Sequence, residues 1–301
     1  MRFWGKSHRT LLLLLIVVWA APARARDDRC GVPILAMTYN IRLDTAVDGQ
    51  NSWPHRRDFL INQIEILRPA LLGMQEVLPN QRADLQSALS GYAFVGGGRD
   101  DGKLAGEASP IAIDRRLFLI EASGTFWLSP TPSIPSTGWD AAYPRIATWA
   151  QLRYKGSKTR LLVINTHWDH VGQQARTESG RQLARWLQDT RTGEEAVIML
   201  GDFNTDSADP AIADMLQLTG LRSAQDATTS TSAGEQPSTF NRFEAQPPAG
   251  LVIDHIFVSE RVAVRRSMVI AQHLNGRVPS DHFPFAALLK LPSKQRGKGC
   301  S

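Results

Sequence analysis

Internal repeats, long linkers and blocks of like charge are all absent from this 301-residue sequence. Their absence excludes a repeat array and favours a single folded domain. Cysteine is also scarce, since the chain has only Cys30 and Cys300. Neither cysteine stands in a polar motif, so a metal site here would use oxygen and nitrogen ligands.

Long hydrophobic runs are limited to one, at residues 11–21. Basic residues precede it and the small residues Ala23 and Ala25 follow, a pattern typical of a secretory signal peptide over residues 1–25. The run is short for a membrane span, and an uncleaved anchor is the alternative. We therefore expect an exported protein, periplasmic or extracellular, with no stable membrane anchor after cleavage.

Net charge becomes small once this segment is removed. Residues 1–25 hold four of the 34 basic residues and none of the 29 acidic residues, so the formal charge falls from +5 to +1. A nearly neutral chain argues against a tight nonspecific grip on long nucleic acid. Residues 26–301 are long enough for one α/β domain, which we expect to be a monomer.

The two cysteines lie near the ends of this domain. An exported chain meets an oxidising compartment, which favours a disulfide between Cys30 and Cys300. Two unpaired thiols on frayed termini are the alternative.

Apolar periodicity predicts that strands and helices alternate along much of the chain. Helices are expected at 52–68, 80–89, 175–187 and 210–218. Strands are expected at 34–41, 70–74, 109–113, 117–120, 124–128, 146–153, 160–168, 197–200, 251–259, 262–270 and 283–291. Two segments are different: 96–106 is rich in glycine and charge, and the proline-rich loop at 130–139 is expected along the rim of a site.

Polar residues stand at or near the ends of many of these strands. The apolar run 197–200, for example, ends in Gly-Asp-Phe-Asn. Asp and Asn also close ordinary turns, which is the structural alternative. Because packed sheets bring such ends to one edge, we expect a polar cluster there, and carboxylates without thiolates favour Mg²⁺ or Mn²⁺ over zinc. The residues concerned are Asn40, Glu76, His167, Asp202, Asn204, Asp254, Asp281 and His282.

The order of these motifs resembles the endonuclease/exonuclease/phosphatase superfamily over about residues 34–291. The motifs are Asn40, Gln75–Glu76, 165–167, 201–204, 253–257 and 280–282. Within it, segments 124–129 and 138–140 are similar to bacterial secreted metal-dependent hydrolases near the carbon-catabolite-repressor-type deadenylases. The resemblance implies an α/β (α+β) fold, a four-layer sandwich of two mostly antiparallel β-sheets flanked by helices.

The resemblance also implies roles. Glu76, Asn40 and Asp281 would bind Mg²⁺, with Mn²⁺ as a substitute. The catalytic set would be His282 oriented by Asp254, together with Asp202, Asn204 and His167; whether His282 or Asp202 is the general base stays open. Several members carry an acidic residue where this chain has Arg42, so we expect one tightly held cation and leave a second open.

Substrate phosphate has four further candidate ligands, Arg56, Arg57, Arg145 and Asn165. Arginine can clamp phosphate with two parallel hydrogen bonds. The structural alternative is that these arginines are solvated or paired with carboxylates and bind no phosphate.

These observations predict a secreted Mg²⁺-dependent phosphoester hydrolase. The leading expectation is a nuclease-like phosphodiesterase, with exonuclease action as one form, acting on nucleic acid or nucleotides by metal-assisted attack of water on phosphorus. The alternative is a phosphomonoesterase or a phospholipid or inositol-phosphate head-group hydrolase, which could use the same residues. A non-catalytic binding protein is the third hypothesis.

Overall fold

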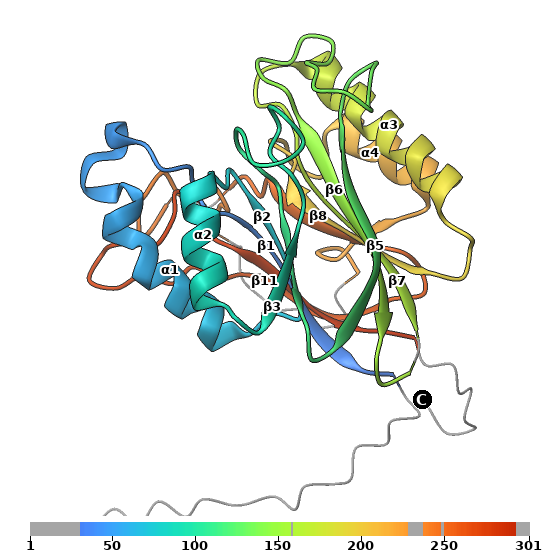
Figure 1. Ribbon diagram of the computed structural model, residues 1–301, viewed down its shortest axis with the longest axis horizontal. Helices are drawn as coiled ribbons and strands as arrows, with labels where there is room; N and C mark the ends of the chain where they lie inside the picture. Colours follow the sequence, from blue (N-terminus) through green and yellow to red (C-terminus); the bar gives the residue numbers. More distant parts are fainter. Residues whose placement is uncertain (1–30, 158, 228–236, 248–249, 293–301) are drawn as a thin grey trace, which may run out of the picture.

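The computed structural model describes residues 31–157, 159–227, 237–247 and 250–292. The expected signal peptide and the Cys30–Cys300 pair lie outside these residues. Two six-stranded sheets stack face to face, and helices cover their outer faces (Figure 1). The predicted four-layer sandwich is therefore confirmed.

Each sheet contains one parallel strand pair among antiparallel neighbours. The first sheet has the order β11-β12-β1-β2-β4-β3, and β1 and β2 are parallel. The second has the order β5-β6-β7-β8-β10-β9, and β7 and β8 are parallel. The strands are β1 (Pro33–Asn40), β2 (Leu71–Gln75), β3 (Tyr92–Val95), β4 (Ile111–Asp114), β5 (Phe118–Trp127), β6 (Ile146–Tyr154), β7 (Arg160–His167), β8 (Ala196–Asp202), β9 (Arg222–Ser223), β10 (Asp254–Val258), β11 (Ala263–Val269) and β12 (Phe285–Lys290).

In the described part of the chain, four α-helices form the two outer layers. In Figure 1, α1 (Trp53–Leu67) and α2 (Pro79–Ala88) lie on the side of the first sheet, and α3 (Gln173–Thr190) and α4 (Pro210–Thr219) on the side of the second. Local chemistry sets their ends. The Asp209 side chain accepts a hydrogen bond from the Ala211 amide at the start of α4, and Gly220 ends that helix with φ 67°.

The hydrophobic core has three parts because the central strands are buried on both faces. In β7, Leu161 and Val163 pack between the sheets, whereas Leu162 and Ile164 pack on the outer face towards α3 and α4. A third cluster joins the first sheet to α1 and α2. This double burial explains why these strands are continuous apolar runs in the sequence.

Two details differ from the sequence-based expectation. β5 is one strand in which a bulge at Glu121 interrupts the pairing, whereas the sequence predicted two strands; a bulge leaves one residue unpaired but lets the strand continue. The short elements β3, β9 and the 3-10 helix η2 (Ala46–Asn51) were not predicted. None of the helices in the described residues has the length and apolar character needed to cross a membrane.

Candidate active site

The two parallel strand pairs place the predicted polar residues at one edge of the sandwich. Asn40 and Gln75 are register partners at the ends of β1 and β2, and His167 and Asp202 at the ends of β7 and β8. Carboxyl ends of parallel strands point the same way, and β1 faces β8 across the core. β10 then enters antiparallel to β8 with Asp254 opposite Asp202.

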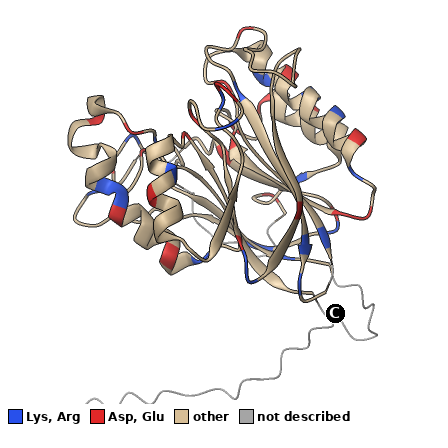
Figure 2. Ribbon diagram, viewed as in Figure 1, with Lys and Arg blue, Asp and Glu red and all other residues tan. Residues whose placement is uncertain are grey.

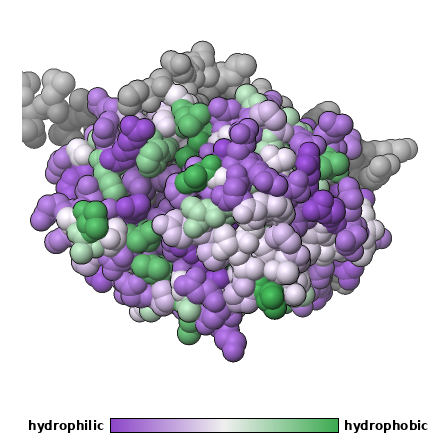
Figure 3. Space-filling view, turned by 90° about the horizontal axis from the view of Figure 1, so that it is seen from above, coloured by the Kyte–Doolittle hydropathy of each residue, from purple (hydrophilic) through white to green (hydrophobic). Residues whose placement is uncertain are grey.

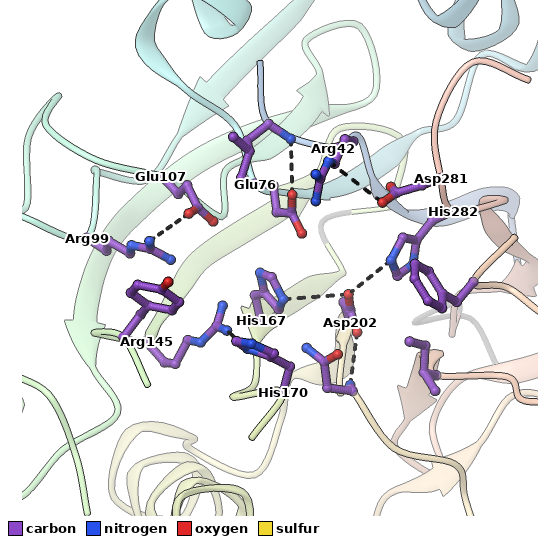
Figure 4. Close-up of a pocket in the computed structure, with 15 residues that line it drawn as sticks. Arg42, Glu76, Arg99, Glu107, Arg145, His167, His170, Asp202, Asp281 and His282 are labelled. Carbon is purple, nitrogen blue, oxygen red and sulfur yellow. Dashed lines mark hydrogen bonds and ion pairs between the residues drawn. The ribbon is translucent and has the colours of Figure 1, made fainter. Parts of the chain in front are cut away.

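Asp202 occupies the centre of the cluster (Figure 4). Its Oδ2 accepts a hydrogen bond from Asn40 Nδ2 at 2.9 Å, and lies 3.6 Å from His167 Nε2 and 3.8 Å from His282 Nε2. Its Oδ1 accepts a hydrogen bond from the backbone N–H of Asn204 at 2.9 Å. Burial, and then the charge of Asp254, raise the pKa of Asp202. A buried carboxylate with a raised pKa, open to a cavity, can accept a proton near neutral pH.

His282 is oriented by Asp254. The Nδ1 atom of His282 lies 2.9 Å from Asp254 Oδ2, so Nε2 is left towards the cavity. Burial lowers the pKa of His282, but the charges of Asp254 and Asp202 outweigh it and raise that pKa to about 10. His282 is thus an imidazolium at neutral pH, a donor that suits an oxyanion.

Glu76 stands just after β2 in the left-handed region, with φ 61°. A non-glycine residue there costs roughly 1–3 kcal/mol, and such strain is concentrated at functional sites. The turn lets Glu76 Oε1 accept from Asn40 Nδ2 at 2.9 Å and Oε2 accept from the Leu43 amide at 3.0 Å. Its carboxylate is thereby fixed at the cavity surface.

His167 and Asn204 also line the cavity. Burial, followed by the charge of Arg145, holds the pKa of His167 well below its usual range, so this histidine is neutral. Asn204 has φ 53°, and its Nδ2 donates to the Trp168 carbonyl at 2.9 Å.

Arg42 and Asp281 complete this side of the cavity. Arg42 binds both oxygens of Asp48 at 2.9 Å and its Nε lies 3.8 Å from Asp281 Oδ2. A guanidinium therefore stands beside an expected metal ligand.

Only one of the four predicted phosphate ligands lies in the cavity. Arg145 lines it, with Nε 3.2 Å from Asp169 Oδ2 and Nη2 3.0 Å from His170 Nδ1. Arginine only donates hydrogen bonds, so His170 Nδ1 is the acceptor in this contact.

The other three side chains have structural positions. Arg56 is buried and donates to backbone carbonyls that include those of Ile41 and Arg42. Arg57 pairs with Asp58 on the surface of α1. Asn165 lies between the sheets, where its Nδ2 donates to the carbonyls of Met74 and Pro110. Their hydrogen-bonding groups are used within the fold, so the structure does not place them as phosphate ligands.

Eight cavity residues were not predicted as site residues, and three of these, Arg99, Glu107 and Tyr143, form one group. They come from two loops, one between β3 and β4 and one between β5 and β6. The glycine- and charge-rich segment 96–106 was the available signal for the first loop, and the proline-rich loop for the second. The whole cavity measures about 420 Å³.

The donor set fits a hard divalent cation. Four carboxylates line the cavity, and three of them, Glu76, Asp202 and Asp281, are not paired with Arg99 as Glu107 is. Ligand atoms of Asp202, Asp254 and His282 also lie within 4.8 Å of one another. That second trio is already bonded internally and Asp254 does not line the cavity, so the cavity-facing carboxylates are the better ligands. Oxygen donors without a thiolate fit Mg²⁺ or Mn²⁺.

Two six-stranded sheets with a buried carboxylate–histidine cluster at one edge define a class of phosphoester hydrolases. The chain belongs to the Endonuclease/Exonuclease/phosphatase family, whose model matches residues 37–282. The predicted superfamily is thereby confirmed.

Similar proteins support this membership. An endonuclease/exonuclease/phosphatase from Bacteroides vulgatus is 35% identical, with a TM-score of 0.80 over 86% of this chain and 99% of that one. A mannosyl-6-phosphatase from Bacteroides thetaiotaomicron is 32% identical, with a TM-score of 0.81 over 85% and 99%. An uncharacterised protein of Acanthamoeba polyphaga mimivirus is 27% identical over 161 residues, which cover 51% of this chain and 60% of that protein.

Proposed function

We propose that this protein is a Mg²⁺-dependent hydrolase of phosphate monoesters of small molecules. The observation that carries the proposal is the cavity of about 420 Å³, which the catalytic cluster and the Arg99, Glu107 and Tyr143 side chains line together. This volume is in the range of small-molecule sites. The 32% identical relative named as a mannosyl-6-phosphatase supports the same substrate type.

Roles follow from the geometry. Glu76 and Asp281 would hold Mg²⁺, which when bound supplies positive charge to the phosphoryl oxygens. Asn40, expected from the sequence as a third ligand, donates through Nδ2 to Glu76 and accepts through Oδ1 from the Arg42 backbone N–H, so its role here is to position Glu76. Asp202, with its raised pKa, takes a proton from the attacking water. His282, kept protonated, donates to a phosphoryl oxygen as negative charge develops. His167, Asn204 and Arg145 add further donors at the cavity surface.

The phosphodiesterase expected from the sequence remains a prediction, as do the alternative of a phospholipid or inositol-phosphate head-group hydrolase and the narrower resemblance to deadenylases. Basic and acidic residues alternate along the ribbon in Figure 2 and are not gathered by sign. A long nucleic acid would be favoured by a continuous basic stripe. The small cavity therefore supports a small substrate over a polymer.

Purified residues 26–301 with Mg²⁺ should be assayed on p-nitrophenyl phosphate, hexose phosphates, inositol phosphates, bis-nitrophenyl phosphate, DNA and RNA. We expect phosphate release from monoesters at a rate at least about 10²-fold above that of His282→Ala, as is typical for a positioned proton donor. His273→Ala, a change at an exposed histidine outside the cavity, is the matched control. Cleavage of diesters or nucleic acid without activity on monoesters would overturn the proposal.

A further inference from the structure

Arg99 and Glu107 form an ion pair at the far side of the cavity from His282 (Figure 4). We propose that this pair binds the hydroxyl groups of a sugar-like leaving group and so determines which phosphate ester the enzyme accepts. The inference rests on the proposed function, because it assigns the second half of the same cavity.

The loop that carries the pair has a fixed shape. The Arg99 amide donates to the Glu107 carbonyl at 2.9 Å, and Asp100 and Ala105 are joined in the same way at 3.1 Å. Trp127 Nε1 donates to the Arg99 carbonyl at 2.7 Å. Gly102 has φ 72°, and a Cβ there would lie 2.8 Å from the Trp127 ring. The backbone therefore places both side chains without help from their ion pair.

The chemistry of the pair matches that of hydroxyl groups. Arg99 Nη2 lies 2.6 Å from Glu107 Oε1, and both side chains keep about one seventh of their surface exposed at the cavity, 14% and 15%. A carboxylate accepts two hydrogen bonds while a guanidinium donates several in a fixed fork. A hydroxyl both donates and accepts, so adjacent hydroxyls of a sugar can bond to the two groups together. The Arg99 guanidinium also makes a cation–π contact with Tyr143, with Cζ 5.0 Å from the centroid of the ring.

Burial of the Glu107 carboxylate costs free energy, and a residue whose only role was to support the loop would not need a buried charge. Burial raises the pKa of Glu107; the charge of Arg99 opposes that shift and the charge of Glu76 adds to it. Perturbed carboxylates in cavities are concentrated at functional sites. The Glu107 carboxylate would repel a second negative charge on the leaving group. The cavity therefore favours a neutral alcohol as the leaving group.

Among the described residues, the face seen in Figure 3 gives no comparable signal. Figure 3 shows that hydrophobic side chains on the face seen from above are scattered among hydrophilic ones. Isolated apolar residues of this kind are normal on a monomer. The leaving group is therefore expected to be recognised inside the cavity.

Binding to phosphonates tests the inference without turnover, because the C–P bond is not hydrolysed. In Mg²⁺, calorimetry should compare the 6-phosphonate analogue of mannose with methylphosphonate. We expect the wild type to bind the sugar phosphonate at least about 10-fold more tightly, since sites built to hydrogen-bond hydroxyls reject analogues that lack them. Glu107→Gln and Arg99→Met should reduce that preference to about threefold or less while changing methylphosphonate affinity by no more than about twofold.

Glu121→Gln is the matched control, because Glu121 pairs with Arg153 at 2.7 Å outside the cavity. It should retain the wild-type preference. An unchanged preference in Glu107→Gln, or equal weakening of both phosphonates, would overturn the inference; the isosteric Glu107→Gln decides if Arg99→Met does not fold. Wild-type hydrolysis of p-nitrophenyl phosphate separately tests the proposed function, since the binding ratio does not depend on turnover.

Discussion

At Asp202, four neighbouring groups converge on one buried carboxylate. The Asn40 side chain and the Asn204 backbone N–H donate hydrogen bonds to it. The Nε2 atoms of His167 and His282 lie within 3.8 Å of its Oδ2. The two histidines differ because only His282 has a carboxylate at its second nitrogen, Asp254. The two pKa values are therefore shifted in opposite directions, so that His167 is neutral and His282 is protonated. The proposed roles require this difference.

Asp254→Asn should move the alkaline limb of the pH–rate profile to lower pH. Activity that needs protonated His282 is present below its pKa, about 10, and is lost as pH rises through that value. Removing the Asp254 charge leaves the effect of burial, which lowers the pKa. Profiles of kcat/KM between neutral and strongly alkaline pH measure the shift. An alkaline limb at the same pH in both proteins would contradict the role given to this pair.

Glu76→Gln should weaken Mg²⁺ binding because an anionic ligand becomes a neutral amide. We expect the metal concentration for half activity, and the calorimetric Kd for Mn²⁺, to rise at least about 10-fold, the loss that follows even when an outer partner of a ligand is removed. Glu65→Gln, at an exposed site on α1, is the control. Full wild-type turnover in excess EDTA would refute metal dependence.

At the scale of secondary-structure elements, Asn165 on β7 ties the two sheets together. Its Nδ2 donates to Met74 and Pro110 of the first sheet, and its Oδ1 accepts from Gln75 at 2.7 Å. Gly73 permits the approach, since a Cβ there would lie 2.6 Å from Asn165 Oδ1. The catalytic edge is thus held by a buried polar bridge between β2 and β7.

Asn165→Ala should lower the free energy of unfolding by about 2–3 kcal/mol, because it leaves buried polar partners without hydrogen bonds. Urea unfolding measures the loss, with exposed Asn62→Ala on α1 as the control. A phosphate ligand would instead raise KM with little change in stability. That second outcome would restore the role expected from the sequence.

At the scale of the whole molecule, the described chain is one sandwich whose cavity lies at a single edge. Export is a proposal that rests on residues 1–25. This segment carries most of the excess positive charge of the chain. If residues 1–25 are removed as proposed, the nearly neutral protein that results fits a small-molecule substrate better than a polyanion.

Expression of the full sequence in a bacterium should yield exported protein whose N-terminal sequence begins at Arg26. Edman sequencing of the periplasmic and medium fractions measures the cleavage. Replacing Ala23 and Ala25 with large residues should block processing, since the peptidase accepts small residues there. An intact N-terminus in the membrane fraction would favour the uncleaved anchor.

Much of the architecture could be predicted because its signals are local. Apolar periodicity predicted ten of the twelve described strands in outline, with β5 divided in two, and all four α-helices. Polar residues at strand ends indicated the cluster around Asp202. Short elements such as β3 and β9 were missed because a few residues carry too little periodicity.

The sequence by itself determined the family, the layered fold and the cluster that contains Glu76, Asp202 and His282, because each depends on short motifs in a set order. Tertiary structure alone decided which polar residues are free to meet a substrate. Asn165 and His167 share a strand face, yet one bridges the sheets and the other lines the cavity. Arg99, Glu107 and Tyr143 meet only because two separate loops fold over that edge, and no local pattern encodes such a meeting.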